Sequence, residues 1–325
     1  MKIGIALNGV LKPHEFLQIA QIADELGVDT IWATEEYLYR SSILNAASIL
    51  EETNRVQVIS GPMTPFLSHQ MFIAREILTL AEKFPDRVGL LMGVGDLKIM
   101  QDFKIDVKKT VETMANALKL VKTLVKGTPF ENNESVFPEL FNRDIGIPIY
   151  MAGMGPRMLA LASQWADGSL ISGLVSIKYI AESVQIIQNL QHGTDKNHDI
   201  AAVMIASTDE NPRIAYENVR PIVAPWVANA AHFPAHLHDW EMCNIETNSS
   251  EIQKALSLGD YDLAFHLLPE KTIDTLAACG TPNVLQERIC TLAQIGVNHI
   301  VIIPTGKIDN MVQTISSAVD ISRRL

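Results

Sequence analysis

The chain has 325 residues, of which 47% are hydrophobic and 19% charged, so it can bury a large core and does not resemble a disordered protein. Its formal net charge is −11, and no basic run is longer than Lys108-Lys109 or Arg323-Arg324. Because neutralising phosphates requires clustered Lys and Arg, these features argue against a nucleic-acid-binding protein.

Cysteine usage and hydropathy indicate a protein of the cytoplasm. Cys243, Cys279 and Cys290 are odd in number and form no close pair, so neither a disulfide framework nor a zinc site is predicted. The first apolar run is too short for a signal peptide, and no run of about eighteen apolar residues follows it. We therefore expect a cytoplasmic chain with no membrane partner.

Short apolar segments alternate with amphipathic ones along the chain. Strands are predicted at 2–7, 30–33, 56–60, 88–92, 147–151, 168–171, 200–207 and 299–303, and helices at 13–26, 43–52, 69–83, 109–126, 177–190 and 284–295. The strands do not alternate with polar residues, which is typical of parallel sheets covered by helices on both faces. Eight such strands favour an α/β fold of the (β/α)8 TIM-barrel type over a doubly wound sheet, which has the same alternation.

The alternation breaks between Ser207 and Cys279, in a segment rich in Ala, His, Asn and Pro. We expect residues 1–325 to form one domain that carries a helical insertion at about 208–278 before the last strand. An insertion on the catalytic face either covers the ligand or forms a subunit contact.

The residues that follow the predicted strands form the candidate site, because the active sites of TIM barrels lie at the C-terminal strand ends. They are Asn8; Thr34, Glu35 and Glu36; Gly61, Pro62 and Met63; Gly93, Gly95 and Asp96; and Ala152, Gly153, Met154, Gly155 and Pro156. Asn8, Glu35 and Glu36 are the catalytic candidates, although a surface pair of glutamates is more often a pair of solvated loop residues. A cis peptide at Gly61-Pro62 would supply a bend where the third strand meets the ligand.

The segment Gly153-Met154-Gly155-Pro156 lies directly between a strand and a helix. Free backbone N–H groups and the positive end of a helix bind phosphate at such positions, and proline suits the first helical position. An ordinary tight turn between strand and helix explains the same pattern.

Other classes of site find less support in the sequence. Pro234 interrupts helical spacing among His232, His236 and His238, and no cysteine or carboxylate pattern completes a metal site, so no metal is expected. The chain has no GxSxG nucleophile elbow and no GK[ST] phosphate loop, which disfavours hydrolases and nucleotidases.

Taken together, the strand-end motifs resemble the bacterial luciferase-like monooxygenase superfamily, most closely its methylenetetrahydromethanopterin reductase branch. The resemblance spans nearly the whole chain. The matching stretches are 30–37, 61–65, 86–96, 147–156, 166–168 and 279–282.

The resemblance implies a flavin- or deazaflavin-dependent oxidoreductase, with FMN or the 5-deazaflavin coenzyme F420 at the strand ends, hydride transfer or oxygen activation, and a small-molecule substrate. It implies that Gly153 to Pro156 hold the cofactor phosphate, that Gly61 and Pro62 form a bulge under the ring, and that Gly93, Gly95 and Asp96 flank the ring or its side chain. By the same resemblance, Thr34, Glu35 and Glu36 lie near the reacting face, and the protein is a homodimer.

Two positions depart from the family pattern. Many relatives have a histidine where this chain has Glu36, and the reductase branch has a glutamate on the first strand where this chain has Ala6. We therefore do not carry over the pterin substrate, and a non-catalytic flavin-binding protein of the same fold stays as the alternative function. A cofactor-free lyase or isomerase is disfavoured, because no lysine ends a predicted strand.

Overall fold

The computed structural model describes residues 1–7, 11–127, 144–193, 197–230 and 233–325. Nine parallel strands form one sheet: β1 Lys2–Leu7, β2 Thr30–Thr34, β3 Gln57–Met63, β4 Val88–Met92, β5 Ile149–Ala152, β6 Gly168–Ile171, β7 Asp199–Thr208, β8 Ala277–Gly280 and β9 His299–Pro304. Pairing in the order β1 to β7 and then β9 closes a ring, because β6 also pairs with β7 and β9 with β1. The predicted TIM barrel is confirmed, since a doubly wound sheet does not close.

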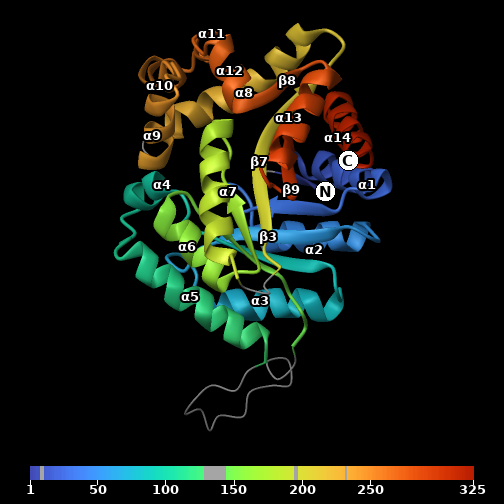
Figure 1. Ribbon diagram of the computed structural model, residues 1–325, viewed down its shortest axis with the longest axis vertical. Helices are drawn as coiled ribbons and strands as arrows, with labels where there is room; N and C mark the ends of the chain where they lie inside the picture. Colours follow the sequence, from blue (N-terminus) through green and yellow to red (C-terminus); the bar gives the residue numbers. More distant parts are fainter. Residues whose placement is uncertain (8–10, 128–143, 194–196, 231–232) are drawn as a thin grey trace.

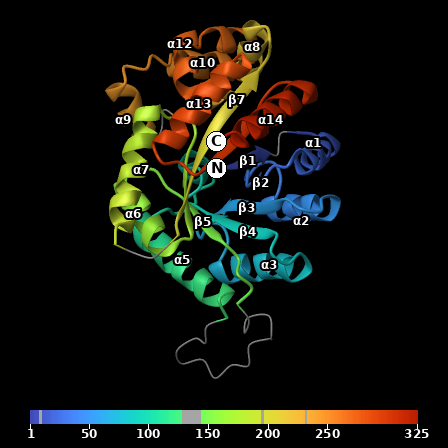
Figure 2. The same cartoon turned by 45° about the vertical axis from the view of Figure 1, so that its right-hand side comes forward.

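Helices surround the barrel and gather at one end of it (Figures 1 and 2). They are α1 Pro13–Leu26, α2 Ser42–Glu52, α3 Gln70–Lys83, α4 Leu97–Asp102, α5 Thr110–Val125, α6 Pro156–Trp165, α7 Ile177–Gln191, α8 Pro212–Ala230, α9 Pro234–Met242, α10 Ser249–Ser257, α11 Tyr261–His266, α12 Glu270–Leu276, α13 Pro282–Gln294 and α14 Ile308–Ser322. No helix in the described ranges is long and apolar enough to span a bilayer.

The strand β8 was not predicted from the sequence. β7 pairs with β9 along one edge, while its other edge pairs with β6 through 199–202 and with β8 through 205–208. β8 thus extends the sheet beyond the short strand β6 and stands outside the closed ring. Four residues that directly follow a helix are too few to produce a periodic hydrophobic pattern.

The apolar side chains form two separate cores. Alternate residues of β1 point to different sides, so that Ile3 and Ile5 pack with the surrounding helices while Ala6 packs inside the barrel with residues such as Trp32 and Leu91. The inner core continues into the apolar faces of α8 to α12. Because both faces of each strand are buried, the strands read as continuous apolar runs in the sequence.

A polar network lies inside the barrel near the N-terminal ends of the strands. The Oδ2 atom of Asp199 accepts hydrogen bonds from Tyr150 Oη at 2.7 Å and Lys2 Nζ at 2.9 Å, and lies 3.2 Å from Nδ1 of the fully buried His299. Burial by itself raises the pKa of the Asp199 carboxyl, but the bonds from these three partners hold that pKa well below its usual range.

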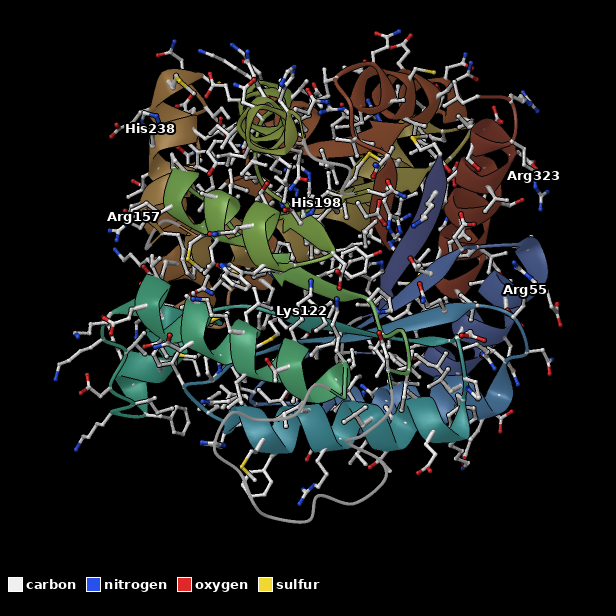
Figure 3. The ribbon with its side chains drawn as sticks, turned by 60° about the horizontal axis from the view of Figure 1, so that its bottom comes forward. Arg55, Lys122, Arg157, His198, His238 and Arg323 are labelled. Carbon is white, nitrogen blue, oxygen red and sulfur yellow. The ribbon has the colours of Figure 1, made fainter. Side chains whose placement is uncertain are left out.

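Two of the basic side chains labelled in Figure 3, Lys122 and Arg323, each donate a hydrogen bond to a carbonyl group at a helix end. Arg323 donates to the carbonyl oxygen of Leu26 at 2.9 Å, at the end of α1, and Lys122 donates to that of Trp165 at 2.8 Å, at the end of α6. Cations at C-terminal helix ends are favourable because they complement the helix dipole.

Candidate functional site

The C-terminal ends of β2, β3 and β4 form a surface of backbone and small side chains. The Gly61-Pro62 peptide is cis, as the sequence indicated, and the pairing of β3 with β4 shifts register between Ser60 and Met63. The N–H of Glu35 donates to the Gly61 carbonyl oxygen at 2.9 Å. The predicted bulge is therefore present, and β2 holds it from one side.

The end of β4 packs closely against this bulge. A Cβ at Gly61 would lie 2.2 Å from the carbonyl oxygen of Leu91, and the φ of Gly61 is +137°, so only glycine fits there. A Cβ at Gly93 would lie 3.0 Å from Cβ of Pro62 and 3.4 Å from that of Ala152. The ends of β3, β4 and β5 therefore meet closely here through side chains that are small or absent.

The β2 end also brings a hydroxyl and a carboxylate together. Thr34 Oγ1 lies 3.1 Å from both the Leu7 carbonyl oxygen and Glu36 Oε1, and its single proton can be donated to either. Glu36 is thus placed at the rim of the barrel with a proton donor beside it. The third catalytic candidate, Asn8, lies outside the described residues.

Glu35 has a structural partner. Its Oε2 atom accepts a hydrogen bond of 2.7 Å from the backbone N–H of Ser42, the first residue of α2. Carboxylates at helix N-termini are stabilised by the unpaired N–H groups and the helix dipole. This contact fixes the carboxylate of Glu35 and leaves Glu36 as the better candidate for moving protons.

Tyr37 extends its ring over the loop after β4. A Cβ at Gly95 would lie 2.1 Å from Tyr37 Oη, and Gly95 has a φ of +88°. Burial, then the charges of Glu35 and Asp96, raise the pKa of Tyr37, so its hydroxyl stays protonated at neutral pH. That hydroxyl is buried and has no hydrogen-bond partner among the described residues.

Asp96 connects three parts of the site. Its Oδ1 atom accepts hydrogen bonds from the backbone N–H groups of Lys98 at 2.8 Å and Ile99 at 3.1 Å, and so caps α4. Its Oδ2 atom accepts a hydrogen bond of 2.9 Å from Nδ2 of Asn229, in α8 of the insertion. The sequence does not suggest this link, since 133 residues separate the two side chains.

The segment from Gly153 to Pro156 begins α6, as predicted. Gly155 has a φ of +84° and precedes Pro156, the first helical residue. The N–H of Gly155 donates to Tyr179 Oη at 3.1 Å, and burial, followed by the charges of Asp239 and Glu182, raises the pKa of Tyr179 to about 12. Space is open where a Gly155 Cβ would lie. A phosphate at this turn would therefore meet both the helix end and a protonated tyrosine.

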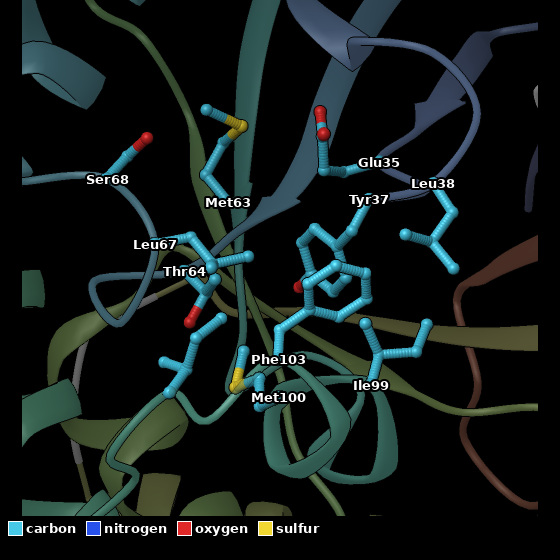
Figure 4. A pocket seen from close by; sticks show the side chains of 11 residues that line it. Glu35, Tyr37, Leu38, Met63, Thr64, Leu67, Ser68, Ile99, Met100 and Phe103 are labelled. Carbon is cyan, nitrogen blue, oxygen red and sulfur yellow. The ribbon is translucent and has the colours of Figure 1, made fainter.

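A cavity of about 490 Å³ opens beside the rim (Figure 4). Its volume is in the range of small-molecule sites. Its polar side chains come from the ends of β2 and β3, and its apolar ones largely from α4 and the adjoining loops. The lining residues are Glu35, Tyr37, Leu38, Met63, Thr64, Leu67, Ser68, Ile99, Met100, Phe103 and Ile105.

No group of three potential metal ligands occurs among the described residues. His236 is buried, and its Nε2 lies 3.1 Å from the carbonyl oxygen of Gly173, whereas His238 of the same helix is exposed. Burial lowers the pKa of His236 and favours its neutral form. His232 lies outside the described residues.

The structure thus brings most of the predicted strand-end residues to one rim. Gly61, Pro62, Gly93 and Ala152 make one surface, Thr34 and Glu36 lie beside β1, and the turn at Gly153 to Pro156 lies farther around the rim. Met154 packs toward the outer core. Tyr37 and Thr64 lie in the strand-end stretches 30–37 and 61–65 but were not among the predicted site residues. Sequence reasoning missed Tyr179 and Asn229, because they meet the site only through contacts with residues far away in the chain.

Comparisons with known proteins agree with this geometry. The family model described as luciferase-like monooxygenase matches residues 1–299. The 5,10-methylenetetrahydromethanopterin reductase of Archaeoglobus fulgidus is 25% identical over 307 residues, which cover 93% of this chain and 92% of the relative. The F420-dependent glucose-6-phosphate dehydrogenase of Mycolicibacterium gilvum is 26% identical over 231 residues, covering 64% of this chain and 69% of the relative.

Solved structures share the fold. The coenzyme F420 dependent tetrahydromethanopterin reductase of Methanopyrus kandleri superposes with a TM-score of 0.83 at 22% identity, over 98% of this chain and 97% of that one. An F420-dependent secondary alcohol dehydrogenase, in complex with an F420-acetone adduct, gives 0.77 at 17% identity over 98% of both chains.

Proposed function

This chain belongs to the luciferase-like monooxygenase family, and we propose that it is an oxidoreductase. It would bind the deazaflavin coenzyme F420 at the C-terminal end of its barrel and would transfer a hydride to or from a small organic substrate. The cofactor is proposed from the relatives whose names include it. FMN is the second candidate, because a solved structure of the same fold is a complex with FMN.

The observation that carries this proposal is the close meeting of Gly61-Pro62, Gly93 and Ala152 at the ends of three neighbouring strands. Backbone and small side chains at this surface permit a planar ring system to lie against it. Gly61, Pro62, Gly93 and Ala152 would contact the ring, and Gly155 with Tyr179 would contact a phosphate. Bound there, the deazaflavin would supply or accept the hydride.

The residues of the chain would position the reactants and handle protons. Thr34 Oγ1 can donate a hydrogen bond to Glu36 Oε1 over 3.1 Å and so orient it, and Glu36 is our candidate general acid or base. Glu36→Gln should lower the rate roughly 10²-fold or more while leaving cofactor affinity nearly unchanged. A wild-type rate in this variant would remove Glu36 from the mechanism.

The first experiment is an absorption titration of the purified protein with coenzyme F420 and, separately, with FMN. Gly93→Ala, which adds a methyl group facing Pro62 and Ala152, should weaken cofactor binding about tenfold, because overpacking a fitted site costs roughly 1–3 kcal/mol. Gly259→Ala adds the same methyl group at an open position of the insertion, where a φ of +75° favours glycine, so it should lower stability but leave the affinity of the folded protein unchanged. Folded protein that binds neither cofactor would refute the proposal.

The alternative, a non-catalytic flavin-binding protein, rests on Ala6, which lies inside the barrel where relatives of the reductase branch have a glutamate. The two functions differ in the fate of the reduced cofactor. A catalyst speeds its reoxidation when a suitable substrate or oxygen is added, whereas a binding protein slows its reoxidation below the rate of the free cofactor.

A further inference from the structure

Helix α8 of the insertion crosses the C-terminal mouth of the barrel. Near its start, Asn218 Nδ2 donates to Ser207 Oγ of β7 at 3.2 Å, and the Asn218 side chain also lies against Gly306, just after β9. Near its end, Asn229 donates to Asp96 after β4. In the closed ring, β4 is directly opposite β9. The two asparagines therefore attach α8 to opposite sides of the rim.

The dimensions agree with this crossing. Asn218 and Asn229 are 229 − 218 = 11 residues apart, which is about 16 Å along a helix. Eight tilted parallel strands about 4.8 Å apart enclose a barrel about 15 Å across. The part of α8 between the asparagines is therefore long enough to span the mouth.

Ile222 and Trp226 lie on the same face of α8 as the two asparagines. Steps of four, four and three residues place positions 218, 222, 226 and 229 on one side of a helix. The adjoining side, which includes Val223 and Val227, is fully buried in the core shared with the other insertion helices. Ile222 and Trp226 thus occupy the stretch that faces the mouth.

Trp226 differs from the neighbouring apolar residues of its helix because the residue is 40% exposed. The edge of the Trp226 ring lies next to Gly173. A Cβ added at Gly173 would be 3.5 Å from Trp226 Cζ3 and 3.1 Å from Val203 Cγ1. Val203 belongs to β7 and packs against the inner core. In the closed ring of strands, β7 lies opposite β3. Trp226 therefore lies across the barrel mouth from the Gly61-Pro62 bulge.

We propose that Trp226, with Ile222 beside it, forms an apolar roof over the substrate site and selects substrates with a flat aromatic or conjugated part. This inference rests on the proposed function, because it takes the Gly61-Pro62 side of the mouth to be the cofactor side. A ligand between Trp226 and the Gly61-Pro62 side of the mouth would contact the ring of Trp226 on the ligand's side away from the cofactor. Planar groups pack best against an indole face.

The test uses two neutral probes of the same carbon skeleton: planar 2-naphthol and its saturated counterpart, decahydro-2-naphthol. Their dissociation constants are measured by calorimetry on wild-type protein saturated with coenzyme F420, and on Trp226→Ala, Trp226→Phe and Ile222→Ala. We expect Trp226→Ala to weaken 2-naphthol binding about 2- to 10-fold more than binding of the saturated probe. Trp226→Phe should retain most of the preference, and Ile222→Ala should weaken both probes alike.

The outcomes separate this inference from the proposed function. Absence of 2-naphthol binding to the wild type, or equal loss of both probes in Trp226→Ala, overturns the inference while leaving cofactor binding intact. The inference is also overturned if Trp226→Ala raises the dissociation constant of the cofactor as much as that of 2-naphthol. Trp226 would then contact the cofactor. If the wild type binds no cofactor, the proposed function fails, and the probe titrations on the protein alone still decide whether Trp226 binds planar ligands.

Discussion

Replacing Asp199 by Asn removes one negative charge from the polar network inside the barrel and changes its shape very little. The carboxylate has three partners, and two of them, Tyr150 and His299, are buried. A hydrogen bond to a charged group contributes about 1.5–3 kcal/mol, against about 1 kcal/mol for a neutral one. The exposed Lys2 contributes little, because its pair with Asp199 is screened by solvent. Replacing these two charged bonds by neutral ones therefore predicts a loss of roughly 1–4 kcal/mol.

Thermal unfolding measures this loss. The unfolding entropy is about 2.1 cal/mol/K per residue, or roughly 0.7 kcal/mol/K for 325 residues, so Asp199→Asn should lower Tm by roughly 1.5–6 °C. Lys2→Met, which removes only the exposed partner, should lower it by less than about 1 °C. An Asp199→Asn variant within about 1 °C of the wild type would refute the claim that this carboxylate stabilises the barrel.

The same network predicts how stability changes with pH. The folded protein holds the pKa of Asp199 below its unfolded value of about 3.9. The stabilisation is therefore complete above about pH 5 and is lost as the pH falls toward the folded pKa. The stability difference between wild type and Asp199→Asn, measured by denaturant unfolding, should be largest near neutral pH and shrink below about pH 4. A difference that grows on acidification would contradict the assigned direction.

Three further changes test other contacts of the site. Glu35→Ala should cost about 1 kcal/mol in urea unfolding, since it removes the acceptor at the N-terminus of α2, and should leave F420 affinity unchanged. Gly95→Ala should destabilise by roughly 2 kcal/mol or more, because the new Cβ meets Tyr37 Oη at 2.1 Å, and adding Tyr37→Phe should restore part of the loss. Asp239→Asn should cost roughly 1–4 kcal/mol, because this fully buried carboxylate accepts hydrogen bonds from Ser176 N at 2.7 Å and Oγ at 2.5 Å. It should also weaken 2-naphthol binding, because these bonds join α9, which follows α8 in the insertion, to α7.

Each of these expectations has a matched contrary result. Glu35→Ala with unchanged stability would mean that the helix end finds another acceptor. A Gly95→Ala variant that Tyr37→Phe does not rescue would place the cost in the backbone, whose φ of +88° favours glycine. An Asp239→Asn variant that is destabilised but binds 2-naphthol normally would show that the roof does not depend on this contact.

The strand and helix pattern alone predicted the barrel, because each buried parallel strand is a short apolar run and each outer helix carries one apolar stripe. The strand-end position of residues such as Gly61 and Gly93 also follows from the sequence, since every parallel strand delivers its C-terminal end to the same rim. The bulge was foreseen from Gly61-Pro62 and from the family resemblance.

The tertiary structure decided how those rim residues are used. It showed that Glu35 caps α2 while Glu36 pairs with Thr34, a difference between adjacent glutamates that depends on where two separate elements meet. It also attached the helix that carries Trp226 to distant parts of the rim, through Asn218 at Ser207 and Asn229 at Asp96. Sequence periodicity reports which face of an element is buried, but it does not report which distant element covers that face, because that depends on the closure of the whole barrel.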